Sequence, residues 1–524
     1  MIETLSYITF LCLSVYSILL LKKELHMMQL NGYFNARYFK WLKESGRKQY
    51  DGIRILIVLC CALPALHYHW LLPAGAMLLS GAGSFMLLKQ KSKKKLDFTR
   101  RAVRLFAVTL LLAAALPAAA WLATRDMRYV APSFALLAGF SFIIIILANT
   151  LAKPVERLIN RWYVKDAEKK IRHYPDLTVI GVTGSYGKTS VKHFLQHILS
   201  ERYHVLITPG SFNTTMGVVR TVREHLQPLH EVFIVEMGAK KTGDVQEICQ
   251  IVRPRYGIIT AVGAQHLETF GSLENVKKAK MELMAALPAT GAGFINFDNC
   301  APADIPAGAE AEVISFAILA GADYCAANIA YGNSGMSFDV YRRKGKMLTL
   351  ETSLLGGHNV SNLLACAAVA LEMGLEKYRI EKAVKSIRAV EHRLEIKTLP
   401  NGITVIDDAF NSNPVGSKMA LEALKRVKGN RKIVITPGMI ELGEKEYELN
   451  YAFGQTIASN SDIAVLVGAG RTRPIQDGIK STRFPAENMM VCKNLQEANE
   501  YVKSIMQQGD VVLYENDLPD TFNE

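Results

Sequence analysis

The sequence predicts a multi-pass α-helical membrane region followed by an α/β part, and three observations lead to this fold class. Segments 5–21, 55–88, 105–123 and 130–152 contain no Asp, Glu, Lys or Arg. From residue 177 onward, short β-rich runs alternate with helical sequence, which is typical of parallel, doubly wound sheets. A glycine-rich loop separates the first of these strands from its helix, in the arrangement of a P-loop.

The charge-free segments are long enough to cross a bilayer, because a transmembrane helix needs about 20 apolar residues. Segment 55–88 is too long for one crossing and contains Pro64 and Pro73, so we expect a hairpin of two short helices there. These segments predict about five crossings within a membrane domain at residues 1–152, followed by a linker at 153–176. A cleavable signal peptide at 5–21 is the alternative, but neither a positive n-region nor a cleavage site accompanies it.

Basic residues set the expected orientation of the membrane domain. Segments 22–54 and 89–104 each contain eight Lys or Arg, and such loops stay in the cytoplasm. We therefore expect a protein of the inner (cytoplasmic) membrane whose remaining domains lie in the cytoplasm. A large part of the net charge of +13 comes from these two segments. Attraction to anionic lipid explains them better than nucleic acid does, so we expect the lipid bilayer as a partner and no nucleic acid.

The part after the linker divides into two domains in this interpretation. Residues 177–395 begin with the strand "LTVIGV" and continue with "VFIVEMG" and "YGIITAVG", each followed by helical sequence. Residues 396–524 contain a second series, "ITVIDD", "KIVITPG", "IAVLVGAG" and "DVVLYEN". The first domain is predicted to be a P-loop parallel-sheet ATPase domain, and the second a smaller Rossmann-like C-terminal domain.

The loop that follows the first strand matches G-x-x-x-x-G-K-[ST] over residues 181–189. Its glycines allow backbone N–H groups to surround phosphate oxygens. Lys188 supplies positive charge for the β- and γ-phosphates, and the Thr189 hydroxyl is suited to Mg²⁺. The expected ATP-binding residues of this loop are Gly184, Ser185, Gly187, Lys188, Thr189 and Ser190.

Further polar residues follow predicted strands or open predicted helices. They are Glu236 in "VEMG", His266 and Lys280 in "GAQHLETFGSLENVKKAKMEL", Asn359 and Asn362 in "GGHNVSN", and Asp408 in "DDAFNSNP". Taken singly, each has an ordinary structural explanation. A lone histidine is usually structural, Lys280 fits a solvated helix face, and Asp–Asp turns and Asn caps are common.

Taken together and in this order behind the P-loop, these motifs resemble the ATP-dependent Mur ligases of bacterial cell-wall synthesis, most of all the MurF-like members. The resemblance covers residues 177 to 510, roughly two thirds of the chain. It implies an ATP-dependent carboxylate–amine ligase that forms an acyl phosphate and then an amide, in peptidoglycan-like cell-envelope synthesis. The expected substrate is an envelope peptide or amino acid, and a membrane-linked form is left open.

The resemblance also implies roles for individual residues. Thr189 and Glu236 would ligate a first Mg²⁺, and His266 a second. Lys280 stands where the family has a carbamylated lysine that supports the second ion. Lys188, His266 and Lys280 would be catalytic. The remaining nucleotide contacts would come from Asn359, Asn362, Arg393 and Asp408, with Asn213 in a loop on the substrate side.

Three departures from the family pattern accompany the resemblance. Membrane helices stand where the family has its UDP-binding N-terminal domain. Asn450 replaces the usual His, and "DLPDTFNE" replaces a Lys-Gly-Ser-type segment. Two alternatives therefore stay open: a poly-γ-glutamate-type polymer synthetase, and an inactive ATP-binding membrane scaffold.

Overall fold

The computed structural model describes residues 2–49, 52–62, 71–89, 95–125, 127–263, 267–318, 321–332, 335–409, 412–440 and 442–516. The chain forms two compact units, the first of residues 1–161 and the second of residues 162–517.

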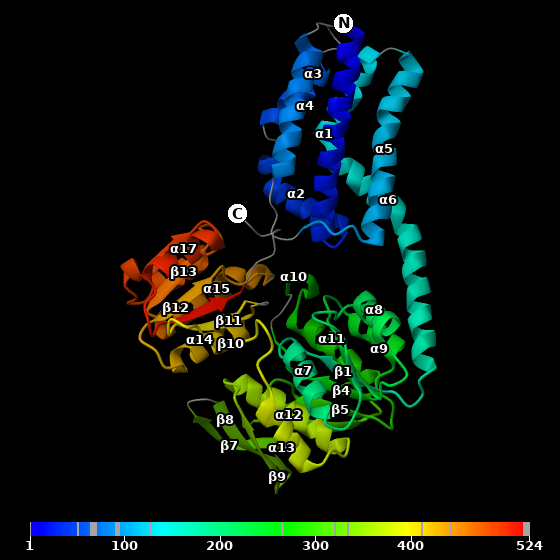
Figure 1. The fold of residues 1–524 in the computed structure, drawn as a ribbon. Coiled ribbons are helices and arrows are strands. Elements are labelled where there is room, and N and C mark those ends of the chain that lie inside the picture. The colour runs from blue at the N-terminus through cyan, green and yellow to red at the C-terminus, as the bar shows by residue number, and fades with distance from the viewer. Residues whose placement is uncertain are drawn as a thin grey trace. The chain divides into compact units, whose positions relative to one another are not determined.

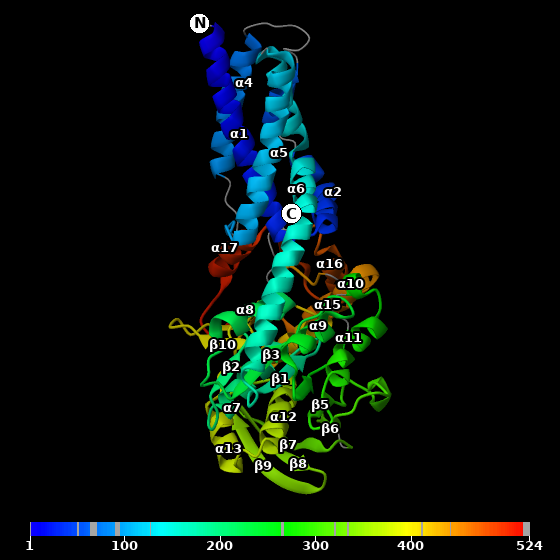
Figure 2. The ribbon, with the colours of Figure 1, turned by 90° about the vertical axis from the view of Figure 1, so that its right-hand side faces the viewer.

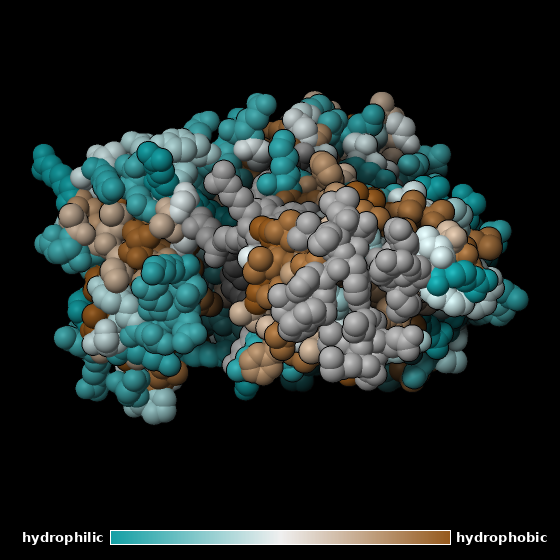
Figure 3. All heavy atoms as spheres, turned by 90° about the horizontal axis from the view of Figure 1, so that it is seen from above, coloured by the Kyte–Doolittle hydropathy of each residue, from teal (hydrophilic) through white to brown (hydrophobic). Residues whose placement is uncertain are grey.

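The first unit is built from α-helices. They are α1 (Ile2–Leu30), α2 (Asn35–Gln49), α3 (Gly52–Ala62), α4 (Leu71–Lys89), α5 (Arg100–Thr124) and most of α6 (Met127–Arg172). Within the described residues, three helices are long and apolar enough to cross a membrane: Leu72–Lys89, Arg100–Thr124 and Pro132–Arg172. Large apolar side chains also face outward, such as Leu78 at 69% and Leu111 at 72% exposure. In the view from above, hydrophobic (brown) patches lie among hydrophilic (teal) surface (Figure 3).

Some helices coincide with the segments that the sequence predicts to cross a membrane. α3 and α4 cover the two arms of the hairpin predicted at 55–88, and the predicted turn between them lies outside the described residues. The predicted linker 153–176 is largely helical, because α6 continues through Pro154 to Arg172. Ala167 and Ile171 on its last turns are buried in the core of the second unit, and this burial stabilises helix beyond the charge-free segment.

Buried charges join four helices of the first unit. Arg54 of α3 lies 3.9 Å from Glu24 of α1, and both are about 2% exposed. Tyr38 of α2 and Ser141 of α6 donate hydrogen bonds to the Glu24 carboxylate at 2.5 and 2.7 Å. α6 has a non-helical backbone at Phe140, and beside this break the Ala138 carbonyl accepts a 2.5 Å hydrogen bond from Arg54.

The second unit contains a nine-stranded sheet in the order β2-β3-β1-β4-β5-β6-β7-β8-β9. The first six strands in chain order run parallel: β1 (Thr178–Thr183), β2 (Val205–Ile207), β3 (Val232–Glu236), β4 (Tyr256–Ile259), β5 (Ala292–Asn296) and β6 (Glu312–Ala317). β7 (Tyr324–Gly332) pairs parallel to β6, whereas β8 (Gly335–Arg342) and β9 (Gly345–Thr352) complete an antiparallel meander. The connections within this meander are too short for the crossover that parallel strands need.

Helices cover both faces of this sheet (Figures 1 and 2). α7 (Lys188–Leu199), α12 (Gly357–Glu372) and α13 (Lys377–Ser386) share one apolar core. α8 (Thr215–His225), α9 (Asp244–Val252) and α11 (Leu273–Ala285) share the other with the end of α6. The sheet is therefore doubly wound, as the alternating pattern predicts.

A second sheet follows, coloured yellow to red in Figure 1, with the order β10-β11-β15-β12-β13-β14. Only β10 is antiparallel to its neighbour. The strands are β10 (Glu395–Thr398), β11 (Thr404–Asp408), β12 (Lys432–Thr436), β13 (Ile463–Val467), β14 (Met489–Cys492) and β15 (Val511–Glu515). α14 (Pro414–Arg426), α15 (Glu446–Asn460) and α16 (Arg473–Lys480) pack on one face, and α17 (Leu495–Ile505) on the other.

Candidate active site

The glycine-rich loop joins the end of β1 to the start of α7, as the sequence predicts. Gly184 and Gly187 have φ angles of +151° and +78°, which residues other than glycine rarely adopt. A Cβ on Gly184 would lie 2.1 Å from Thr260 Oγ1, and one on Gly187 would lie 2.6 Å from Asn362 Oδ1. No side chain caps the first turn of α7. Its backbone N–H groups are therefore available to an anion, and they suit a phosphate chain.

Lys188 begins α7 and folds back over the loop. Its Nζ donates hydrogen bonds to the carbonyls of Gly184 at 2.6 Å and Ser185 at 3.2 Å. Burial lowers the pKa of Lys188 to about 8; the charge of Glu236 opposes this fall, and that of Arg393 adds to it. Phosphate oxygens would replace two neutral carbonyls as acceptors, which favours the charged ammonium.

Glu236 ends β3 and is only 1% exposed. Its Oε1 accepts a hydrogen bond from Asn213 Nδ2 at 3.1 Å, and its Oε2 lies 3.0 Å from Lys192 Nζ. Burial alone would raise the pKa of Glu236, but the charges of Lys192 and Lys188 hold it below its usual value. The carboxylate therefore stays ionised, which a magnesium ligand requires.

Lys280 lies on α11 and is 2% exposed. No hydrogen bond or ion pair holds its ammonium within the described part of the chain. Burial lowers the pKa of Lys280 to about 7; repulsion from Lys188 adds to this, whereas Asp244 and Glu282 oppose it. With this pKa, a substantial fraction of the Lys280 amine is neutral near pH 7, and the neutral amine is the form that can react as a nucleophile with carbon dioxide.

Of the nucleotide-binding residues predicted further along the chain, Asn362 lies against the loop and Arg393 acts electrostatically on Lys188. Asn362 lies against Gly187, and its Nδ2 points toward Asn359 Oδ1 at 3.5 Å. Burial lowers the pKa of Arg393, with the charges of Asp408 and Glu236 opposing the change. Burial raises the pKa of Asp408 to about 6, and Arg393 limits the rise. Arg393 is therefore electrostatically coupled to Lys188, Glu236 and Asp408.

The metal-binding prediction is supported in one part only. Thr189 lies in the first turn of α7, directly after the loop, and Glu236 ends β3, which pairs with β1. Glu236 Oε2 accepts no hydrogen bond of good geometry. A hydroxyl and an ionised carboxylate are hard oxygen donors that suit one Mg²⁺ ion, and this first site stays a prediction. Among the described residues, no three His, Cys, Asp or Glu side chains are grouped to hold a metal. His266 lies outside the described residues, so the second site stays a prediction.

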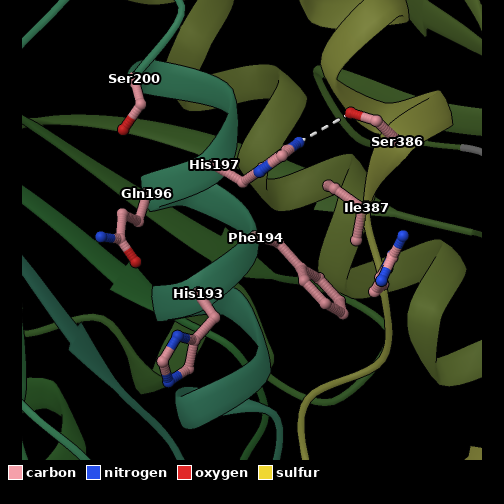
Figure 4. A pocket seen from close by; sticks show the side chains of 8 residues that line it. His193, Phe194, Gln196, His197, Ser200, Ser386 and Ile387 are labelled. Atoms are coloured by element: carbon pink, nitrogen blue, oxygen red, sulfur yellow. Dashed lines mark hydrogen bonds between the residues drawn. The ribbon is translucent and has the colours of Figure 1, made fainter.

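A pocket of about 480 Å³ lies along α7 (Figure 4). His197 Nε2 and Ser386 Oγ are 2.8 Å apart across it. Because the Ser386 hydroxyl donates to the Ala383 carbonyl, His197 Nε2 must be the donor of this pair. None of the predicted site residues lines this pocket, whose walls are formed by His193, Phe194, Gln196, His197, Ser200, Ser386, Ile387 and Arg388.

Sequence reasoning missed two residues that hold Glu236. Lys192 was not singled out, although it stands four residues after Lys188 and therefore one helical turn away. Thr208, whose hydroxyl accepts a hydrogen bond from the Glu236 backbone at 3.1 Å, carries no recognisable signal in the sequence.

The fold and the loop together define a P-loop nucleotide-binding protein with a doubly wound sheet. Two family models match the chain: the Mur ligase middle domain over residues 182–370, and the Mur ligase, glutamate ligase domain over residues 392–514. The UDP-N-acetylmuramoyl-tripeptide–D-alanyl-D-alanine ligase of Escherichia coli (strain K12) is 30% identical over 331 residues, which cover 61% of this chain and 73% of that protein. The chain belongs to the Mur ligase family.

Other relatives agree with this assignment. The ligase of the same name from Mycobacterium tuberculosis (strain ATCC 25618 / H37Rv) is 32% identical over 304 residues, or 56% of this chain and 59% of that protein. The chain thus spans about three fifths of the length of such relatives. A crystal structure of MurF from Acinetobacter baumannii matches with a TM-score of 0.62 and 24% identity, covering 68% of this chain and 77% of that one. The MurF ligase from Thermotoga maritima in complex with ADP matches with a TM-score of 0.59 and 23% identity, covering 68% of this chain and 80% of that one. These structures support the fold.

Proposed function

We propose that the chain is a membrane-anchored, ATP-dependent amide ligase that acts on a peptide or amino acid of the cell envelope. One observation carries the proposal: Lys188 folds back over the phosphate-binding loop, and Glu236, Lys280 and Arg393 each interact electrostatically with it. A nucleotide-binding scaffold would need the loop but not a nearby buried amine. The curated relatives, which are named as ligases, support the same conclusion.

The proposed reaction has two steps. A substrate carboxylate oxygen attacks the γ-phosphorus of ATP, the bond to the bridging oxygen breaks, and ADP leaves. An amine then attacks the acyl carbon of the resulting acyl phosphate, so that inorganic phosphate leaves and the amine loses a proton. Such a transfer brings several anions together, and catalysis consists mostly of positioning and charge stabilisation.

The chain's own residues would divide this work. The loop and the first turn of α7 would hold the phosphates, and Lys188 would stabilise charge on the γ-phosphate. Thr189 and Glu236 would hold Mg²⁺, which screens the phosphate charges when bound. Arg393 and Asp408 would contact the nucleotide from the second sheet's side, with Asn359 and Asn362 from α12. A carbamate on Lys280, with His266, would support a second ion.

The anchor supports an envelope substrate at the inner face of the membrane. Three apolar helices stand in the part of the chain that precedes the family match. A soluble nucleotide precursor would not require them. We further propose that residues 1–152 form the membrane domain, that residues 177–395 activate the carboxylate, and that residues 396–524 receive the amine.

The test is a substrate screen with the full chain in detergent. The protein is incubated with ATP, Mg²⁺ and paired envelope amino acids and peptides, and mass spectrometry identifies the pair that joins with loss of one water. Glu236→Gln serves as the inactive variant and Lys385→Met, an exposed lysine of α13, as the active control. ATP turnover with glutamate alone would favour a polymer synthetase. ATP binding without turnover on any pair would contradict the proposal and favour a scaffold.

A further inference from the structure

Lys192 is a fully buried lysine with 0% exposure, one turn after Lys188 on α7. A buried ammonium is costly unless it is paired and hydrogen-bonded, so its partners indicate its role. One partner is the Glu236 carboxylate, with Nζ and Oε2 3.0 Å apart. The other is the Gly210 carbonyl, which accepts a 2.6 Å hydrogen bond from Nζ. Lys192 thus bridges the predicted magnesium ligand and the loop at residues 208–214.

The same loop is attached to Glu236 at further points. Asn213 donates to Glu236 Oε1 at 3.1 Å, and the Asn213 carbonyl accepts from the Gly238 backbone at 2.7 Å. Gly238 leaves no room for a side chain, because a Cβ there would lie 2.8 Å from Asn213 Cγ. The position of Glu236 and the position of the loop therefore depend on each other.

We propose that Lys192 is a positioning residue that couples occupation of the nucleotide–metal site to the conformation of the 208–214 loop. A divalent cation at Glu236 competes with the Lys192 ammonium for the same carboxylate. With the carboxylate engaged by a cation, Lys192 would lose its ion pair, and the hydrogen bond from Asn213 to Glu236 would weaken. The loop, which the family resemblance places on the substrate side, then becomes free to rearrange around the carboxylate substrate. This inference rests on the proposed function in that the ligand at Glu236 is a magnesium nucleotide.

The competition predicts an effect that simple structural damage would not produce. Lys192→Met keeps an unbranched side chain that is one atom shorter and removes the charge. Because the competing ammonium is gone, Mn²⁺, used as the probe for the metal, should bind more tightly. We expect a gain of about 5- to 150-fold, the usual range for coupling between sites. A purely structural role for Lys192 predicts weaker Mn²⁺ binding instead.

The experiment uses the full chain in detergent and two readouts, Mn²⁺ binding by electron paramagnetic resonance and hydrogen exchange of peptides that cover residues 208–214. In the unmodified protein, Mg²⁺ with a non-hydrolysable ATP analogue should speed exchange of the loop at least fivefold. In Lys192→Met the loop should exchange fast with or without the nucleotide. Lys192→Arg should preserve the nucleotide response, and Lys385→Met should change neither readout.

Three results separate the possible failures. If Lys192→Met does not fold, the double variant Lys192→Met/Glu236→Gln removes both charges, and the loop should then exchange fast regardless of nucleotide. A nucleotide-dependent loop in either variant, or weakened Mn²⁺ binding in Lys192→Met, overturns the coupling while leaving the proposed function standing. Absence of Mn²⁺ and nucleotide binding in the unmodified protein overturns both.

Discussion

Replacing Lys280 with Met should stabilise the folded protein, and most strongly below pH 7. The side chain is 2% exposed, and burial lowers the pKa of Lys280 from 10.5 to about 7. Between these values the unfolded chain binds more protons at this position than the folded chain, so stability rises with pH. The destabilisation by the buried ammonium is complete below pH 7 and disappears by pH 10.5. The fall in pKa corresponds to at most about 5 kcal/mol.

The assay is thermal unfolding of the full chain in detergent at pH 6, 8 and 10, in buffers free of carbon dioxide so that Lys280 stays an amine. For a domain of roughly 200 residues, 1 kcal/mol shifts the Tm by about 2–4 °C. We expect Lys280→Met to raise the Tm by at least about 5 °C at pH 6 and by much less at pH 10. Lys278, exposed on the same helix, provides the control Lys278→Met. A lower Tm for Lys280→Met at pH 6, or a shift that does not change with pH, would refute this account of Lys280.

Further predictions test the site and the packing around it. Lys188→Ala should abolish ATP turnover without lowering the Tm, since it removes a half-buried charge held by two carbonyls. Lys280→Ala should lose turnover and regain part of it with added short carboxylic acids; no regain would count against the carbamate. Phe294→Ala, at a fully buried position in β5, should cost about 3–5 kcal/mol in unfolding experiments. Asn450 bonds both the N–H and the carbonyl of Met439 at 2.9 and 3.0 Å, so Asn450→Ala should lower the Tm measurably by leaving these buried groups unsatisfied.

The residues that sequence reasoning placed correctly belong to local patterns. Gly187, Lys188 and Glu236 lie where a strand–loop–helix signature and a strand end put them. The spacing of four residues indicates only that Lys192 shares a face of α7 with Lys188; its importance comes from contacts with β3 and with Gly210, which lie outside α7. The sequence predicts only part of α6 for a similar reason. The charge-free segment stops before Lys153, whereas the helix continues because residues much further along the chain bury its last turns.

The sequence patterns also did not predict the antiparallel strands β7 to β9 of the nine-stranded sheet. Residues 291–355 read as mixed and glycine- and alanine-rich, so only their inclusion in the first domain was expected. Strand β7 alternates buried and half-buried positions over its first four residues, but a register shift between Ala327 and Ala330 interrupts the alternation. Such an irregularity weakens the period-2 signal by which strands are recognised.

The Glu24–Arg54 pair has a consequence for how the first unit is made. In the membrane domain proposed above, Glu24 of α1 and Arg54 of α3 would each be an isolated charge near hydrocarbon, where an unpaired ion is expensive. The carboxylate, the guanidinium and the hydroxyls of Tyr38 and Ser141 satisfy one another only when four helices have come together. Under that proposal, incomplete assemblies of the unit would leave a charge unpaired, and only the complete four-helix cluster would pair it.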